Sequence, residues 1–406
     1  MAARGIRACN LWLSSALAVA LAGCLEGPVV DRGDVRVVEL ASSTATEGWA
    51  VNYPKQRKVL FMRGRLWLFY SDGRDLLART TLDGETLTAP FVVREEAVFG
   101  HRCAFAYDGA SLHSACCLAL PGADVFYRRG VPSEDGLSIA WDGDEQIAFD
   151  VPDAQSVLYP KILADASGRP WVAFMLFEGG FETAPQRAMV VRSSRADGVW
   201  ATASGFPYAL SAPSTETFPD PLGVALASGG TYWIWDPDGE SHYVGRVWTE
   251  EAGFGSEEQI SEGRHRHGLF DAVADGDEVH VSYGGGAVHY RHRDPSGRWS
   301  MERTVISRHG SGHTSIASLG DGRALVTWLD VEGRRTVQRE IGADFTGPAT
   351  LVLDAGSDGI AGRLGINLNG LAAPAGGLRS AITATLGAGP TYRVVLATRP
   401  EPSSED

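Results

Sequence analysis

The segment Ala166-Ser167-Gly168-Arg169-Pro170-Trp171-Val172-Ala173-Phe174 joins a short polar turn to an apolar stretch that contains two aromatic residues. Turns of this composition connect antiparallel strands tightly, and the stretch that follows is typical of a buried β-strand. Similar turn and strand pairs recur at intervals of very roughly 45 to 60 residues, whereas helical periodicity is almost absent. The clearest further examples lie at 66–70, 232–235, 279–283 and 325–328, with weaker copies at 112–116 and 378–383.

In each copy a short strand precedes the turn, so the apolar stretch after the turn is the second strand of a unit. A third strand, in which apolar and polar residues alternate, follows it. Often a fourth strand comes next, preceded by glycine and an aromatic residue. Four antiparallel strands of this kind make one blade of a β-propeller. We therefore predict an all-β fold, a seven-bladed β-propeller of four-stranded antiparallel blades. Its second strands are centred on Trp67, Leu112, Trp171, Trp233, Val279, Leu325 and Ile382. Six blades are the alternative, because the copy at 103–117 is irregular.

The last blade has three evident strands, at 365–368, 378–385 and 392–397, and a spare strand lies near the N-terminus at 35–40. If that N-terminal strand becomes the outer member of the last blade, the ring closes and no sheet edge is left open. We expect the propeller to span 35–398. A disordered acidic tail is expected at 399–406.

The N-terminal region has the layout of an export signal. Arg4 and Arg7 precede an apolar run at 11–21 that is too short to span a bilayer comfortably. The tetrad Leu21-Ala22-Gly23-Cys24, which ends this region, resembles the lipobox of bacterial lipoproteins. An uncleaved membrane anchor and an ordinary secretory signal are the alternatives.

The lipobox resemblance implies a signal peptide at 1–23, lipidation of Cys24 and a lipidated tether at 24–34. More than one acyl chain on the cysteine would make the membrane anchor durable. Leu25, rather than aspartate, follows the cysteine, which by the same resemblance favours the outer membrane. We therefore expect a monomeric, lipid-anchored protein of the cell envelope.

Composition excludes some classes of partner. The 406 residues include 36 lysine and arginine against 50 aspartate and glutamate, a formal net charge of −14, which argues against nucleic acid as a ligand. Only Lys55, Lys58 and Lys161 are lysines. This excess of arginine is typical of a GC-rich genome, so a single arginine is weak evidence of function.

Three cysteines follow Cys24 in the sequence: Cys103, Cys116 and Cys117. Cys103 precedes and Cys116 follows a turn at 108–111, so antiparallel pairing would place them opposite each other. We expect a disulfide between these two residues, with Cys117 facing the other side of the sheet. Three buried free thiols are the alternative, because a register shift of one residue would remove the pairing. No spacing of cysteine and histidine suggests zinc.

The segment Asp294-Pro295-Ser296-Gly297-Arg298-Trp299 resembles the Asp-box of sialidase-like and BNR-repeat propellers, with the glycine displaced by one position. The resemblance implies a propeller fold and a hairpin turn that has a structural role. The Phe-Arg-Ile-Pro signature of sialidases is missing, and Tyr159-Pro160-Lys161-Ile162 is only a distant counterpart. Cleavage of sialic acid is therefore not expected.

In a propeller the starts of the innermost strands surround one mouth of the central channel. Polar residues immediately before the first strand of a blade are therefore candidates for a site, although ordinary channel lining is the alternative. The candidates are His101, Arg102, Tyr159, Lys161, Asp220, His265, His267, Asp271, His313 and Arg363.

Two functional hypotheses follow. In the first, the mouth binds a glycan or a partner protein of the envelope. Tyr159 or Phe218 would supply an apolar surface, and the polar contacts would come from His101, Arg102, Lys161, Arg266 and Arg363. In the second, the protein is a carbohydrate-active enzyme. A glycoside hydrolase would use Asp220 and Asp271, and a polysaccharide lyase His267, His313 and Tyr159. A purely structural envelope protein is a third possibility.

Several histidines cluster in sequence, but no metal site or other cofactor is predicted. His265, His267 and His313 would be an incomplete ligand set. We assign His280, His289 and His292 to a blade surface. The aromatic residues of the second strands are expected to pack between blades rather than to form a binding stripe.

Overall fold

The fold is taken from a computed structural model of the chain. It describes residues 34–45, 49–51, 53–118, 120–179, 184–215, 218–237, 242–263, 269–284, 286–307, 314–330, 335–354, 364–386 and 391–401. The expected signal peptide, Cys24 and most of the expected tail lie outside the described residues. Within these ranges no helix is long and apolar enough to cross a membrane.

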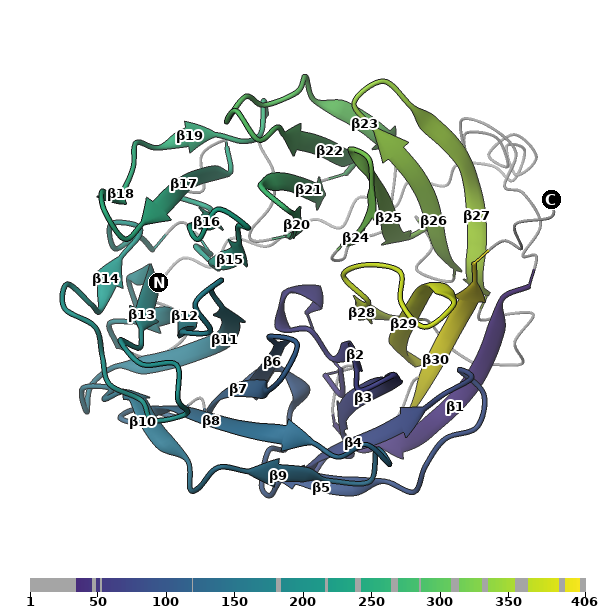
Figure 1. The fold of residues 1–406 in the computed structure, drawn as a ribbon, viewed down its shortest axis with the longest axis horizontal. Coiled ribbons are helices and arrows are strands. Elements are labelled where there is room, and N and C mark those ends of the chain that lie inside the picture. The colour runs from purple at the N-terminus through teal and green to yellow at the C-terminus, as the bar shows by residue number, and fades with distance from the viewer. Residues whose placement is uncertain are drawn as a thin grey trace, which may run out of the picture.

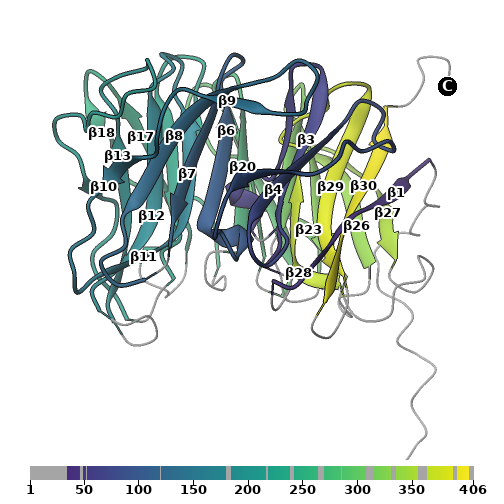
Figure 2. The ribbon, with the colours of Figure 1, turned by 90° about the horizontal axis from the view of Figure 1, so that it is seen from below.

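Within the described residues the strands form seven antiparallel sheets around a common centre, seen face-on in Figure 1 and from the side in Figure 2. In each of the first six blades the strands follow one another outward in chain order. The predicted second strands occupy the second position of every blade. The seven-bladed propeller is therefore confirmed, and the six-bladed alternative is excluded.

The first blade contains β2 (Val59–Met62), β3 (Arg65–Ser71), β4 (Leu76–Thr81) and β5 (Phe91–Arg94). The second contains β6 (Cys103–Tyr107), β7 (Leu112–Cys117), β8 (Val125–Pro132) and β10 (Gln146–Phe149), with β9 (Ile139–Trp141) also paired to β8. The third contains β11 (Ser156–Ala164), β12 (Pro170–Phe177), β13 (Gln186–Arg192) and β14 (Tyr208–Ala209).

The fourth blade contains β15 (Leu222–Ala225), β16 (Thr231–Trp235), β17 (Val244–Thr249) and β18 (Gly253–Phe254), with β19 (Glu258–Gln259) also paired to β17. The fifth contains β20 (Phe270–Asp275), β21 (Glu278–Gly284), β22 (Val288–Arg293) and β23 (Arg303–Ile306). The sixth contains β24 (Ser315–Gly320), β25 (Arg323–Leu329), β26 (Arg335–Gly342) and β27 (Thr346–Asp354). The seventh contains β28 (Leu364–Gly370), β29 (Leu378–Leu386), β30 (Tyr392–Pro400) and β1 (Arg36–Ser43).

The N-terminal strand closes the ring, as predicted. β1 pairs with β30 from Tyr392 to Thr398 and is the outer strand of the seventh blade. It begins and ends later than the expected 35–40, and β30 runs to Pro400, past the expected boundary at 398. Beyond β1, the chain turns to the first blade, where the Ser43 hydroxyl donates to the carbonyl of Ser71 at 2.7 Å. The seam therefore joins the last blade to the first.

The large aromatic residues of the second strands fill the space between blades. Trp67, Trp171, Trp233, Trp235 and Trp328 are each at most 1% exposed. Trp171 of the third blade lies against Trp233 of the fourth, with ring centroids 5.6 Å apart. Aromatic rings at such distances bury large apolar areas. The expected packing role is confirmed, and none of these rings is available as a binding stripe.

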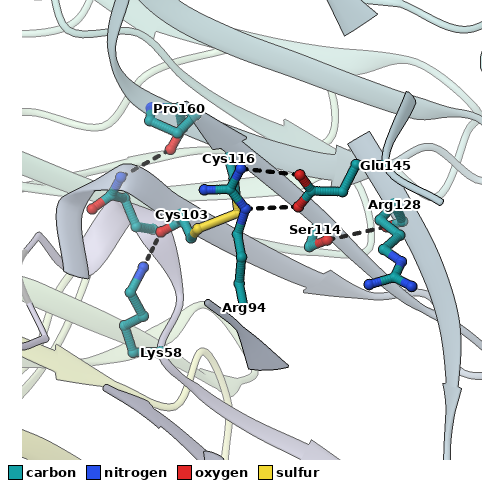
Figure 3. Close-up of a disulfide and its surroundings, with 9 residues drawn as sticks. Lys58, Arg94, Cys103, Ser114, Cys116, Arg128, Glu145 and Pro160 are labelled. Atoms are coloured by element: carbon teal, nitrogen blue, oxygen red, sulfur yellow. Dashed lines mark hydrogen bonds and ion pairs between the residues drawn. A yellow bond between two sulfur atoms is a disulfide. The ribbon is translucent and has the colours of Figure 1, made fainter. Parts of the chain in front are cut away.

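The hairpin of β6 and β7 pairs Cys103 with Cys116, and the two residues form the expected disulfide (Figure 3). Cys117 is a buried thiol on the opposite face of β7 and packs in a core shared with the third blade. The pairing is enforced by the tight turn, in which the Asp108 carboxylate accepts hydrogen bonds from the backbone N–H groups of Ala110 and Ser111.

The segment that resembles an Asp-box has a structural role. The Asp294 carboxylate accepts hydrogen bonds from the backbone N–H groups of Ser296 and Arg298 and so holds the turn. The indole N–H of Trp299 donates to Glu258 of the fourth blade at 2.9 Å. This turn therefore links two neighbouring blades.

Candidate functional site

The centre of the propeller is occupied by a short segment that precedes the first blade. It consists of Tyr53, the 3-10 helix η2 (Pro54–Gln56), Arg57 and Lys58. η2 contacts β6, β11, β20 and β28, the innermost strands of four blades, and Figure 1 shows this purple stretch reaching the middle of the ring. We call this stretch, residues 53–58, the central segment.

Backbone and side-chain amides hold the central segment in place. The Gln56 side-chain amide donates to the carbonyl of Pro160 on the third blade at 3.0 Å. From the seventh blade, the Asn369 amide donates to the carbonyl of Tyr53 and its Oδ1 accepts from the N–H of Lys58. Because Asn369 is fully buried, both its donor and its acceptor are satisfied by this one segment. The segment is thereby fixed between opposite parts of the ring.

Two lysines share one carboxylate in the interior. Lys55 Nζ lies 2.5 Å from Asp220 Oδ2, and Lys161 forms an ion pair with Asp220 Oδ1. All three side chains are at most 2% exposed. Lys55 also lies over the ring of Phe270, 4.2 Å from its centroid. This group, the lysine cluster, joins the central segment to the third and fourth blades.

A second buried ion pair joins the central segment to the fifth blade. Arg57 donates to Asp271 Oδ2 at 3.0 Å and to the carbonyl of Ala272 at 2.5 Å. Asp271 is fully buried and also accepts hydrogen bonds from the backbone N–H groups of Ala272 and Ile316. The Asp271 carboxylate therefore links the central segment to two neighbouring blades.

Burial lowers the pKa of all three lysines. The pKa of Lys55 falls to about 7, because desolvation outweighs the opposing effect of Asp271 and Asp236. The pKa of Lys161 falls well below its usual value through desolvation and the nearby charge of Lys55. Lys58, whose Nζ donates to the carbonyl of Cys103 (Figure 3), also has a strongly lowered pKa through desolvation.

The lowered pKa of Lys58 predicts a stability that depends on pH. The unfolded chain binds a proton at Lys58 up to a pKa of about 10.4, whereas the folded chain releases it at lower pH. Since the unfolded state then holds more protons, the free energy of unfolding rises with pH in that window. Replacing Lys58 by methionine should flatten the slope at pH values just below about 10 by up to about 1.4 kcal/mol per pH unit. Urea denaturation at a series of pH values measures this.

Arg74→Met is the matched control, because the Arg74 side chain is 85% exposed and an arginine does not titrate in this range. It should leave the slope unchanged. An unchanged slope in the Lys58→Met variant would show instead that Lys58 stays protonated in the folded protein.

Three partly exposed aromatic rings come together beside the lysine cluster. Tyr53 and Tyr159 lie with ring centroids 4.7 Å apart and hydroxyl groups 3.3 Å apart, and Phe218 lies 5.4 Å from Tyr159. They come from the central segment, the third blade and the stretch before the fourth. We call these three rings the aromatic platform. Burial raises the pKa of both tyrosines, and for Tyr53 the neighbouring Tyr159 raises it further.

Tyr159 has an unusual backbone. Its φ is +53°, in the left-handed region that residues other than glycine rarely adopt, and it lies where the pairing of β11 with β12 shifts register. The bulge directs Tyr159 toward the platform while Lys161, two positions later in the strand, joins the lysine cluster. Backbone strain of this kind is concentrated at functional sites.

The structure brings some of the predicted residues together. Tyr159, Lys161 and Asp220 lie in or beside the lysine cluster and the platform. Arg102 belongs to the 3-10 helix η3 (Gly100–Arg102), which packs on β11, the strand that contains Tyr159. His101 also belongs to η3. The candidates His265, Arg266, His267, His313 and Arg363 lie outside the described residues.

The expected hydrolase carboxylates are enclosed by cations and backbone amides. Asp220 is 1% exposed and Asp271 is fully buried, and each is bound by internal cations. A hydrolase needs two carboxyl groups that flank the scissile bond and reach the substrate or water. In this arrangement the two groups hold the centre together, so we do not assign them to catalysis.

Sequence reasoning missed the central segment. The central segment leads into β2 of the first blade, whereas the candidate residues named from the sequence lie at the starts of the other six blades. The scarcity of lysine was the available signal, because in a chain where arginine replaces lysine almost everywhere, three retained lysines mark positions where arginine is unsuitable. All three prove to be buried at the centre: Lys55, Lys58 and Lys161.

The sequence matches no known family model and no curated protein. Solved structures do resemble it. A PL25 ulvan lyase with a bound GlcA-containing saccharide has a TM-score of 0.55 at 10% identity, over 88% of this chain and 95% of the lyase. The polysaccharide lyase Uly1 has a TM-score of 0.52 at 10% identity, over 90% and 99%. The microbial sialidase Hz136 has a TM-score of 0.47 at 12% identity, over 78% and 73%. The chain therefore shares the fold of the two polysaccharide lyases.

Proposed function

We propose that the protein binds a polysaccharide segment on the aromatic platform of Tyr53, Tyr159 and Phe218. The observation that carries this proposal is the meeting of three partly exposed rings, from three separate segments, directly beside a rigid, charged centre. Sugar rings present apolar C–H faces that pack on aromatic rings, while their hydroxyl groups need polar partners. Both kinds of surface are present here.

Arg102 favours an acidic sugar as the ligand. Its guanidinium lies over the Phe99 ring, 4.9 Å from the centroid, and its Nε is buried with no hydrogen-bond partner among the described residues. Burial lowers the pKa of Arg102, which reflects incomplete compensation of its charge. A carboxylate or sulfate group on the ligand would balance this charge. The similarity in fold to lyases that act on polysaccharides supports the same ligand class.

The binding proposal is tested by calorimetric titration of the chain from residue 34 onward with neutral and acidic polysaccharides. Tyr159→Ala and Phe218→Ala should each weaken binding by at least about tenfold, because each removes an aromatic surface for the sugar. Tyr208→Ala is the matched control. Tyr208 stacks on Phe254 at the outer edge of the third blade and should leave binding unchanged. Equal effects of the three substitutions, or no binding to any polysaccharide, would contradict the proposal.

A polysaccharide lyase is the second candidate. Such an enzyme removes the proton beside a uronate carboxylate and breaks the glycosidic bond at the next carbon, leaving a double bond in the product. The strained Tyr159, whose hydroxyl lies 3.3 Å from that of Tyr53, favours this candidate because a tyrosine can deliver or accept such a proton.

Tyr159→Phe separates the two candidates. The variant keeps the ring and should keep binding, but it lacks the hydroxyl that a lyase would use. Turnover, followed by the ultraviolet absorbance of the unsaturated product, should be lost in this variant if the protein is a lyase and absent from the unmodified protein if it only binds.

Lipidation of Cys24 and an envelope location stay predictions from the leader sequence. In this proposal the tether would hold the propeller beside the membrane, where a surface or periplasmic polysaccharide is accessible.

A further inference from the structure

A second group of polar residues lies away from the centre, on the fifth blade. Glu278 and His280 belong to β21, and His292 lies opposite His280 on β22. One ligand-type atom from each of the three lies within 4.8 Å of the others. His292 Nε2 is 3.1 Å from Glu278 Oε2, and the rings of the two histidines stack with centroids 4.8 Å apart. We call these residues the blade-five triad.

His280 is the unusual member of the triad. Its side chain is fully buried, and its Nδ1 is hydrogen bonded to the Tyr290 hydroxyl at 2.8 Å. Its Nε2 is buried with no hydrogen-bond partner among the described residues, because the nearest Glu278 oxygen is 3.9 Å away. A buried polar atom without a partner is costly, so such an atom calls for an explanation.

The second blade contains a closely similar arrangement in which that atom is satisfied. His113 on β7 contacts the Tyr127 hydroxyl through Nδ1 at 2.9 Å, and its Nε2 is 3.0 Å from Asp108 Oδ2. The residue opposite His113 is Arg129 rather than a histidine. In the second blade the histidine Nε2 therefore has a direct hydrogen bond to a carboxylate. In the fifth blade the corresponding Nε2 of His280 has no such bond, and a second imidazole, that of His292, lies beside it.

We propose that the blade-five triad of Glu278, His280 and His292 binds a divalent transition-metal ion of the zinc type. Two imidazoles and a carboxylate are suitable ligands for such an ion, and water would complete its coordination. The hydrogen bond between Glu278 and His292 is replaced by two bonds to the metal, and the His292 proton is then carried on Nδ1. Tyr290 fixes the tautomer and orientation of His280, as partners of ligating histidines do.

The triad is accessible to an ion from solvent. The side chains of Glu278 and His292 are 27% and 11% exposed, whereas His280 forms the floor of the site. Gly322, in the turn between β24 and β25 of the next blade, faces the triad. A Cβ there would lie 4.0 Å from both Glu278 Oε2 and His292 Cε1, so a larger side chain at this position would cover the triad. An ion would therefore reach the triad past the partly exposed side chains of Glu278 and His292.

The test is calorimetric titration of the chelator-treated chain with zinc chloride, together with the ligand-field spectrum of the cobalt-loaded protein. One zinc ion per chain should bind and raise the melting temperature. His292→Gln and Glu278→Gln should abolish stoichiometric binding, and Tyr290→Phe should weaken it about 10- to 100-fold. Both ligand substitutions are at partly exposed positions and should leave the fold intact, which circular dichroism checks.

Two controls address other histidines. His113→Gln alters the closed counterpart on the second blade and should leave zinc binding unchanged. The double variant His265→Gln, His267→Gln should also bind normally. The proposal is overturned if the unmodified chain binds no zinc, if His292→Gln and Glu278→Gln bind it as the unmodified chain does, or if only the double variant loses it.

Discussion

Replacing Asp220 by alanine is expected to lower the free energy of unfolding by about 3–5 kcal/mol. Asp220 is the shared partner of Lys55 and Lys161, and all three side chains are buried. Without the carboxylate, two ammonium groups remain close together in the interior with their main counter-charge removed. Their pKa values would fall further, so the loss should be largest at low pH and smaller in alkaline solution. Urea denaturation of both proteins measures the difference.

Two comparison variants test whether the loss of stability in Asp220→Ala comes from the unpaired buried lysines. Asp197→Ala removes an ion pair with Arg195 in which both side chains are half exposed, and it should leave the free energy of unfolding almost unchanged. The triple variant Lys55→Met, Asp220→Leu, Lys161→Met replaces the whole cluster by apolar side chains of similar size and should recover most of the loss. Equal costs for Asp220→Ala and Asp197→Ala would show that the central ion pairs contribute little.

The propeller was predictable because its signals are local and repeated. Turns such as Gly320-Asp321-Gly322 require positive φ, which the structure shows at all three residues, and apolar strands follow them at regular intervals. Each turn and strand pair is a weak signal by itself, but seven copies at similar intervals are a strong one. The irregular second blade can therefore be recognised from its place in the series. Strand ends are less predictable, since β1 and β30 extend as far as their pairing allows rather than to a change in composition.

The centre was harder to predict because its contacts join residues far apart in the chain. Lys58 meets Asn369, and Arg57 meets Asp271, through a ring whose closure determines which lead-ins become neighbours. The blade-five triad was missed for a different reason. An alternating strand places His280 and Glu278 on one face, but only the register of β21 with β22 brings His292 opposite. Without the register of β21 with β22, the sequence does not distinguish a histidine on the blade surface from a histidine that could bind a metal ion.

A chain that begins at residue 46 is expected to lose the folded monomeric state. It lacks β1, which pairs along β30 and whose Leu40 is only 1% exposed in a core shared by the seventh and first blades. Loss of a buried leucine alone costs about 2–5 kcal/mol, and a whole domain is stable by only about 5–15 kcal/mol. Removing β1 also exposes the edge of β30, which can then pair with other chains. Size-exclusion chromatography and thermal unfolding should show aggregates without a cooperative transition.

The control is a chain that begins at residue 34, which keeps β1 and its bonds to the first blade and should fold as a cooperative monomer. A synthetic peptide of residues 34–45, added during refolding of the shorter chain, should restore the transition, because it would pair with β30 while its Ser43 and Thr44 bond again to Ser71 and Asp72. If the shorter chain were instead monomeric with an unchanged melting temperature, the outer strand would be dispensable. Closure would then depend on the inner strands and on the central segment, whose helix η2 contacts the innermost strands of four of the seven blades.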